Sequence, residues 1–293
     1  MTELDSTPLT ASDRSPDLVV IEPTRGLLDI GARDLWHYRE LLYFLVWRDV
    51  KIRYKQTALG AVWTVLQPLL TVLVFTIVFS RIAGIAVEGV PYPVFSLAGL
   101  LPWTFFSQGL TSSSNSLVGS SHLITKVYFP RILIPTAAVL AGLLDLAIAL
   151  VALFVVMLVY GLTLVSGFLL LPLVLVLAFC VTFGVGIWLS SLNVRYRDVR
   201  YLVPFSVQLW LFLSPVIYPA ADITRALVAR GLPGWLYGLN PMVGVIEGFR
   251  WCVYGSGPPP TALILTSSVV AVLVMTSGVI FFRKVERSFA DVV

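Results

Sequence analysis

The sequence predicts an all-α polytopic membrane protein with six transmembrane helices, an amphipathic N-terminal interface helix, and short re-entrant external helices between spans 5 and 6. Two observations lead to this fold class. Of 293 residues, 58% are hydrophobic and only 12% are charged, whereas a soluble domain carries roughly a quarter charged residues. The basic residues also gather at the edges of long uncharged runs, which is typical of chains that cross a bilayer rather than bind nucleic acid.

The chain begins with a polar stretch. It contains little apolar surface and no basic stretch followed by an apolar one, so we expect 1–30 to be a disordered cytoplasmic tail without a cleavable signal peptide. In 31–57, Tyr38, Leu42 and Leu45 recur at helical spacing. This pattern predicts an amphipathic helix over 33–47. The helix lies either on the cytoplasmic leaflet, with its polar face toward a partner, or packed only on the protein's own cytoplasmic face.

A dense group of cations separates this helix from the first apolar run. Arg48, Lys51, Arg53 and Lys55 stand close together, and residues 56–80 then carry no charge. A run of that length can cross ~30 Å of hydrocarbon as a helix. Cations at the root of such a run mark the cytoplasmic side of a membrane.

Further apolar runs follow along the chain. The longest of them, 132–194, contains a single charged residue before Arg195 and is divided by a turn near Gly161 and Pro172. The fifth run contains three prolines, which should kink it or end it. The expected spans are 59–79, 94–117, 133–160, 169–189, 201–219 and 261–282.

The stretch between spans 5 and 6 is broken by glycine and proline. Its apolar part, 231–246, is too short to cross a bilayer and contains Pro233, Gly234 and Pro241. We therefore expect short helices that enter the membrane and return, with their backbone buried in protein. With the amino terminus inside, most cations lie on the cytoplasmic side, which predicts that both termini are cytoplasmic. The cations left outside are Arg81, Arg225, Arg230 and Arg250.

The sequence does not predict a catalytic residue, a metal site or a cofactor in this chain. It has no phosphate-binding Gly-x-x-x-x-Gly-Lys-Ser/Thr motif, so the chain should not bind and hydrolyse ATP by itself. His37 and His122 are far apart and form no ligand cluster. Cys180 and Cys252 do not form a disulfide framework, and we expect both to be unpaired thiols.

Asp145 is the one ionisable residue well inside an expected span. An acid within a membrane suggests function, because its burial is expensive. A role in proton relay is one interpretation. A polar bridge that supports helix packing is the other, and it fits better because a proton-coupled transporter would use several such groups.

Two polar segments resemble each other, and each stands just before an outward-running span. Together they predict either a basic collar where a pore opens to the cytoplasm, suited to bidentate phosphate contacts, or ordinary topology anchors with local Arg–Asp pairs. Considered alone, the residues favour the anchors. The candidate collar residues are Arg48, Lys51, Arg53, Tyr54, Lys55, Arg195, Arg197 and Arg200.

Aromatic residues lie in or near the spans. Their faces can stack on sugar rings in a conduit, but aromatics are also routine at membrane boundaries, so both interpretations stay open. The candidate conduit aromatics are Trp63, Trp103, Phe106, Trp210 and Tyr218.

Five passages resemble the family of ABC-2 type polysaccharide export permeases, in order and in spacing. The first is RDVKIRYKQT at 48–57, which continues as LGAVWTVLQP at 59–68. The others are KVYFPR at 126–131, NVRYRDVR at 193–200, SPVIY at 214–218 with NPM at 240–242, and VERSFAD at 285–291. The resemblance covers nearly the whole chain and makes 58–293 an ABC-2 type transmembrane domain.

The resemblance implies a transport subunit of a bacterial inner membrane that exports O-antigen-like polysaccharide on a lipid diphosphate carrier. It also implies a second copy of the chain and two separate ATPase subunits, which bind ATP and Mg. The carrier diphosphate would meet the candidate collar, and a coupling helix would seat in the ATPase. The coupling residues are Lys126, Val127, Tyr128, Phe129, Pro130 and Arg131.

Other functions are less consistent with the sequence. An ABC-2 exporter of a small hydrophobic drug or lipid is the nearest alternative. A membrane-embedded glycosyl- or acyltransferase would need catalytic groups at the membrane surface, where only Glu88, Asp222 and Glu247 are available. A secondary transporter fits poorly with one buried acid and no clear inverted repeat.

Overall fold

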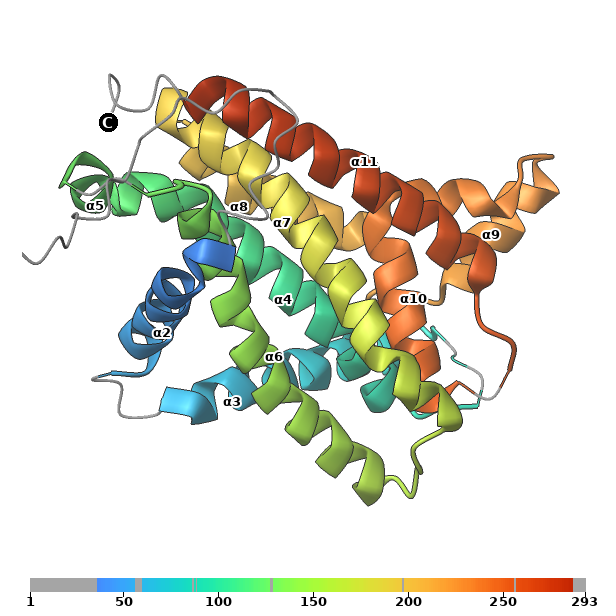
Figure 1. Cartoon of the computed structure of the whole chain (residues 1–293). Coiled ribbons are helices and arrows are strands. Elements are labelled where there is room, and N and C mark those ends of the chain that lie inside the picture. The colour runs from blue at the N-terminus through green and yellow to red at the C-terminus, as the bar shows by residue number, and fades with distance from the viewer. Residues whose placement is uncertain are drawn as a thin grey trace, which may run out of the picture.

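The computed structural model describes residues 36–55, 60–85, 87, 89–126, 129–196, 198–255 and 257–286. Within these ranges every regular element is helical, as the sequence predicts. Figure 1 shows α4 (Tyr92–Gly119) in the middle of the bundle, with α6 (Leu133–Val159) and α7 (Leu171–Arg195) packed against it. The short helix α5 (Ser121–Lys126) lies at one end of the bundle and α9 (Ala220–Ala229) lies at the other.

Four helical stretches are long and apolar enough to cross a membrane. They agree with four of the expected spans, those at 59–79, 133–160, 169–189 and 261–282. The first joins α3 (Gly60–Phe75) to a π-helix, η1 (Thr76–Ile82). The third joins the 3-10 helix η2 (Ser166–Leu170) to α7, and the last is α11. The stretches are Val62–Ile82, Leu133–Val159, Ser166–Arg195 and Thr261–Glu286.

The other two expected spans differ from a simple apolar helix. Helix α4, which contains the expected span at 94–117, is 28 residues long, but it carries many hydroxyl and amide groups and buries most of its side chains inside the bundle. Helix α8 (Val199–Leu213) has 15 residues and is therefore about 22 Å long, shorter than the hydrocarbon layer. The expected end of this span at 219 is wrong, because the chain leaves the helix at Ser214 and Pro215.

The interface helix is longer at its carboxyl end than the sequence predicts. Helix α2 (Arg39–Tyr54) continues past 47 and includes most of the basic group. It packs against α6, and its buried Leu45 joins an apolar cluster with Phe129 and Leu133. Several large side chains of α2 point away from the bundle instead. These exposed residues are Tyr43, Phe44, Trp47 and Ile52, and Trp36, which precedes the helix, is exposed as well.

Three short helices occupy the stretch between α8 and α11. They are α9, the 3-10 helix η3 (Gly234–Leu239) and α10 (Pro241–Tyr254). Asn240 caps α10 by accepting a hydrogen bond from the Met242 amide at 3.1 Å. Helix α10 lies among α4, α7 and α11, and nearly all of its side chains are buried. The broken sequence pattern therefore corresponds to short helices, one of which is an interior element.

Helices α7 and α11 cross at very short range. A Cβ atom built on Gly184 of α7 would lie 2.8 Å from the backbone nitrogen of Met275 in α11. A Cβ on Gly278 of α11 would lie 2.7 Å from the carbonyl oxygen of Gly184. Small residues let helix backbones approach closely inside a membrane, so these two glycines determine the distance between the helices.

Candidate functional site

A cavity of ≈ 780 Å³ lies among α2, α3, α4, α6 and α8; we call it the groove. Its wall includes a basic residue and an acid at one place, and both uncharged polar and apolar side chains elsewhere. The lining residues are Arg53 and Tyr54 of α2; Trp63, Thr64, Gln67, Pro68 and Thr71 of α3; Leu100, Leu101, Trp103, Thr104, Phe105, Ser107, Gln108, Thr111 and Ser112 of α4; Gly142, Asp145, Leu146 and Ala149 of α6; and Pro204 and Val207 of α8.

One face of α4 supplies a row of polar groups to the groove. Thr104, Ser107 and Thr111 recur at helical spacing, and each donates its hydroxyl to a carbonyl of its own helix at 2.8 to 3.1 Å. Their oxygens remain available as acceptors toward the groove. The amide of Gln108 on α4 and that of Gln67 on α3 add both donors and acceptors. This spacing is visible in the sequence, but an apolar span was expected there.

At one place in the groove, Asp145 meets the carboxyl end of α2. Arg53 donates from Nη1 to Oδ2 of Asp145, and the Tyr54 hydroxyl donates to Oδ1. The second guanidinium nitrogen of Arg53 lies 3.3 Å from Oγ of Ser112. Burial is the main cause that raises the pKa of Tyr54, and the hydrogen bond to Asp145 raises it further. The Tyr54 hydroxyl therefore keeps the proton that it donates. Asp145 is therefore a polar bridge between α2 and α6.

Of the remaining candidate collar residues, those that the structure describes do not line the groove. Arg48 pairs with Asp49 at 2.8 Å, and Lys51 lies over the Trp47 ring at 5.5 Å. Lys55 is exposed just after α2. Arg195 and Arg200 are also exposed. The guanidinium of Arg195 lies 5.6 Å from the centre of the Tyr196 ring, and that of Arg200 lies 4.6 Å from the centre of the Tyr201 ring. Arg197 lies outside the described residues.

The candidate conduit aromatics fall into three settings. Trp63 and Trp103 line the groove. Phe106 is fully buried, with its ring 5.4 Å from Trp103 and 5.0 Å from Trp210. Trp210 donates to Asn240 at 2.9 Å, which ties α8 to the cap of α10. Tyr218 lies in the segment after α8, and its hydroxyl is 3.1 Å from that of Tyr237.

The predicted coupling residues are partly used inside the protein. Phe129 is buried in the cluster around Leu45. Arg131 donates to the carbonyl of Glu286 at 2.8 Å, which ties this segment to the end of α11. Pro130 is half-buried, whereas Lys126 is exposed at the end of α5. Val127 and Tyr128 lie outside the described residues.

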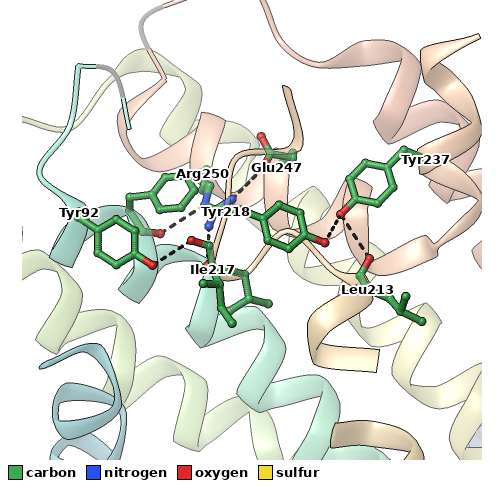
Figure 2. A network of polar contacts seen from close by, with 9 residues as sticks. Tyr92, Leu213, Ile217, Tyr218, Tyr237, Glu247 and Arg250 are labelled. Carbon is green, nitrogen blue, oxygen red and sulfur yellow. Dashed lines mark hydrogen bonds and ion pairs between the residues drawn. The ribbon is translucent and has the colours of Figure 1, made fainter. Parts of the chain in front are cut away.

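A second polar network lies where α10 meets the start of α4 (Figure 2). Arg250 is 3% exposed, pairs with Glu247 at 2.8 Å, and donates to the carbonyls of Phe95 at 3.3 Å and Val216 at 2.9 Å. Its guanidinium also lies 3.5 Å from the centre of the Phe95 ring. Tyr92 donates to the carbonyl of Ile217 at 2.9 Å.

This network, which we call the Arg250 network, joins three segments that are distant in sequence. It fixes α10, the start of α4 and the turn after α8 to one another (Figure 2). Gly99 makes room for it, because a Cβ there would lie 2.5 Å from Nη2 of Arg250. The sequence identified Arg250 only as a cation outside the membrane.

Taken together, the fold and the groove define a polytopic helical membrane protein with a partly polar cavity among its helices, which is typical of a transport protein. Residues 40–254 match the family described as ABC-2 type transporter. The chain belongs to this family.

The sequences of several named proteins are similar to this chain along most of its length. It is 30% identical over 89% of its length, and 98% of the relative's, to a Myxococcus xanthus protein named O-antigen export system permease protein RfbA. A Klebsiella pneumoniae protein of the same name is 27% identical over 88% of this chain and 97% of that relative. The Escherichia coli polysialic acid transport protein KpsM is 26% identical over 70% of this chain and 78% of its own length.

Proposed function

We propose that this chain is the transmembrane subunit of an ATP-driven exporter that moves lipid-linked, O-antigen-like polysaccharide from the cytoplasmic to the outer face of a bacterial inner membrane. The groove is the observation that carries the proposal. It offers hydroxyl and amide groups in a row, together with the aromatic faces of Trp63 and Trp103. Sugar chains present many hydroxyls and stacking faces, whereas a hydrophobic drug presents neither in number. The names of the relatives support the same substrate class.

The proposed arrangement in the membrane has six spans, with α4 and α8 as the second and fifth. The α5 end of the bundle faces the cytoplasm and the α9 end faces outward. In this arrangement α9, η3 and α10 form the external, partly re-entrant segment. The end of α11 lies beside Arg131, so both belong to the cytoplasmic side. The cation distribution supports this orientation.

The working unit contains two copies of the chain and two ATPase subunits that bind ATP and Mg. Helices α3 and α8 contribute to the groove wall and also expose large apolar side chains, among them Leu73 and Phe205. A second copy set against these helices would close the groove from the lipid. The exposed end of α5 offers the surface for an ATPase subunit.

Lys126 tests the ATPase contact. Replacing Lys126 with glutamate is expected to weaken co-purification of the ATPase subunits several-fold, because the exposed cation at the end of α5 is reversed. The matched control is Lys284→Glu, a second exposed cation in the last turn of α11. Equal losses in both variants would place the contact elsewhere.

Arg53 tests the transport proposal itself. We propose that its guanidinium contacts the carrier's diphosphate at the cytoplasmic end of the groove, where a charge-assisted hydrogen bond is worth about 1.5–3 kcal/mol. Replacing Arg53 with glutamine is therefore expected to lower exported polysaccharide at least about tenfold, while the subunit still inserts and assembles. Lys55→Gln removes an exposed cation two residues away and should export normally. Normal export by Arg53→Gln at normal protein levels would contradict the proposal.

A further inference from the structure

Arg53, the cation that reaches the groove, already has a carboxylate partner inside the protein. Asp145 receives one donor on each of its two oxygens, and the donors come from consecutive residues of α2, Arg53 and Tyr54. The side chains of Arg53 and Asp145 are only 27% and 14% exposed, so water screens the pair incompletely. The groove thus contains an ion pair rather than a bare cation.

Helix packing alone does not account for this pair. A carboxylate in the middle of an apolar helix is expensive, and α6 carries no other charge. A buried ion pair can often be replaced by apolar side chains of similar volume without loss of stability. Because both charges line a cavity, their placement indicates a role in what the cavity binds.

A bare arginine here would select its ligand poorly. The bilayer presents singly charged phosphate headgroups in great excess over any carrier lipid, and a guanidinium binds phosphates of either kind. With Asp145 beside it, an approaching phosphate meets repulsion from the carboxylate as well as attraction from Arg53. Specificity often depends on such a repulsive group as much as on the attractive one.

We propose that Asp145 is a specificity-determining residue. As an internal counter-ion it keeps Arg53 paired when singly charged phospholipid headgroups approach, and Arg53 leaves it only to bind the carrier's diphosphate. The inference rests on the proposed function of Arg53. A diphosphate carries more charge and more acceptor oxygens than a single phosphodiester. Its attached sugar also reaches the polar row of α4, which phospholipids do not engage.

Tyr54 allows this exchange without leaving the acid unpartnered. When Arg53 turns from Asp145 to a phosphate, the Tyr54 hydroxyl still donates to Oδ1 of Asp145. Ser112, whose Oγ is 3.3 Å from the guanidinium, offers a hydroxyl to a phosphate that Arg53 binds. Tyr54 is therefore a positioning residue that keeps the carboxylate near Arg53 in both states.

Carrier binding in competition with phospholipid tests this role. The full-length permease with its ATPase subunits is placed in nanodiscs of phosphatidylcholine, or of phosphatidylcholine mixed equally with singly charged phosphatidylglycerol. The probe is a labelled polyprenyl diphosphate that carries a short sugar chain. Wild-type protein should bind similar amounts of probe in both lipids. Asp145→Asn should bind it in phosphatidylcholine but lose about tenfold in phosphatidylglycerol. Lys55→Gln, which removes an exposed cation outside the groove and leaves the ion pair intact, should behave as wild type.

Each contrary result has its own meaning. If Asp145→Asn resists phosphatidylglycerol as well as wild type does, the counter-ion role is overturned and the carrier contact of Arg53 stands. If wild-type protein itself loses the probe to phosphatidylglycerol, the role is overturned whether or not the variant folds. If Arg53→Gln binds the probe like wild type in both lipids, the proposed carrier contact fails, and this inference fails with it.

Discussion

Replacing Arg250 with leucine is expected to reduce the stability of the packing around α10 by about 3–5 kcal/mol, the usual loss when one partner of a buried ion pair is removed. Glu247 loses its cation, and the carbonyls of Phe95 and Val216 lose their donor. The turn after α8 is then held to α10 by apolar contacts and by the hydrogen bonds that Asn240 donates to Leu213 and Ser214. The measurement is the temperature at which the detergent-solubilised protein stops eluting as a single species.

A neighbouring helix supplies a matched control for Arg250→Leu. Arg225 pairs with Asp222 at the same spacing of three residues, but the two side chains are 77% and 50% exposed. Arg225→Leu should therefore change stability by less than about 1 kcal/mol. The double variant Arg250→Leu with Glu247→Leu should recover part of the loss, because no unpaired charge remains. Equal melting of the Arg225 and Arg250 variants would contradict the importance of the Arg250 network.

Replacing Gly184 with alanine is expected to destabilise the contact between α7 and α11 by about 1–3 kcal/mol, the range for overpacked interiors. The new methyl group would lie 2.8 Å from the backbone of Met275, and backbone atoms cannot turn aside as a side chain can. The two helices must move apart along their crossing. The same melting measurement reports the loss.

The control for Gly184→Ala is the same substitution in open space. A Cβ on Gly119, the last residue of α4, would have nothing within 4 Å. Alanine favours helix over glycine by about 1 kcal/mol, so Gly119→Ala should leave stability unchanged or slightly raised. The two variants are thus expected to differ in sign. A stabilised Gly184→Ala protein would show that the helices adjust without cost.

The parts of the fold that the sequence predicts well depend on local composition. The runs at 133–160 and 261–282 are long and apolar, so their length alone determines that they form helices. The end of the fifth span was predicted six residues too far along, because apolar residues continue after α8. The turn at Ser214 and Pro215 ends the helix in spite of them.

The site depends on contacts between distant parts of the chain, which periodicity does not reveal. Asp145 was noticed as an isolated acid, and a polar bridge was one of its two interpretations. Its partner Arg53 is 92 positions away, and Tyr54 is 91. Arg250 was assigned to the outside by its position between spans. Its burial arises because α10 inserts among three helices, an arrangement that no local pattern specifies.

The hydroxyl groups of α4 have a consequence for movement through the groove. Thr104, Ser107 and Thr111 donate their hydroxyl hydrogens to backbone carbonyls of their own helix, so toward the cavity these hydroxyls act only as acceptors. Water and sugar hydroxyls both satisfy an acceptor, and a water-mediated contact is nearly as favourable as a direct one. Replacing a water by a sugar hydroxyl at one of these acceptors therefore changes the free energy of the contact little. In the proposed exporter, such a hydrated surface stays in contact with a long sugar chain and holds no single sugar unit in place.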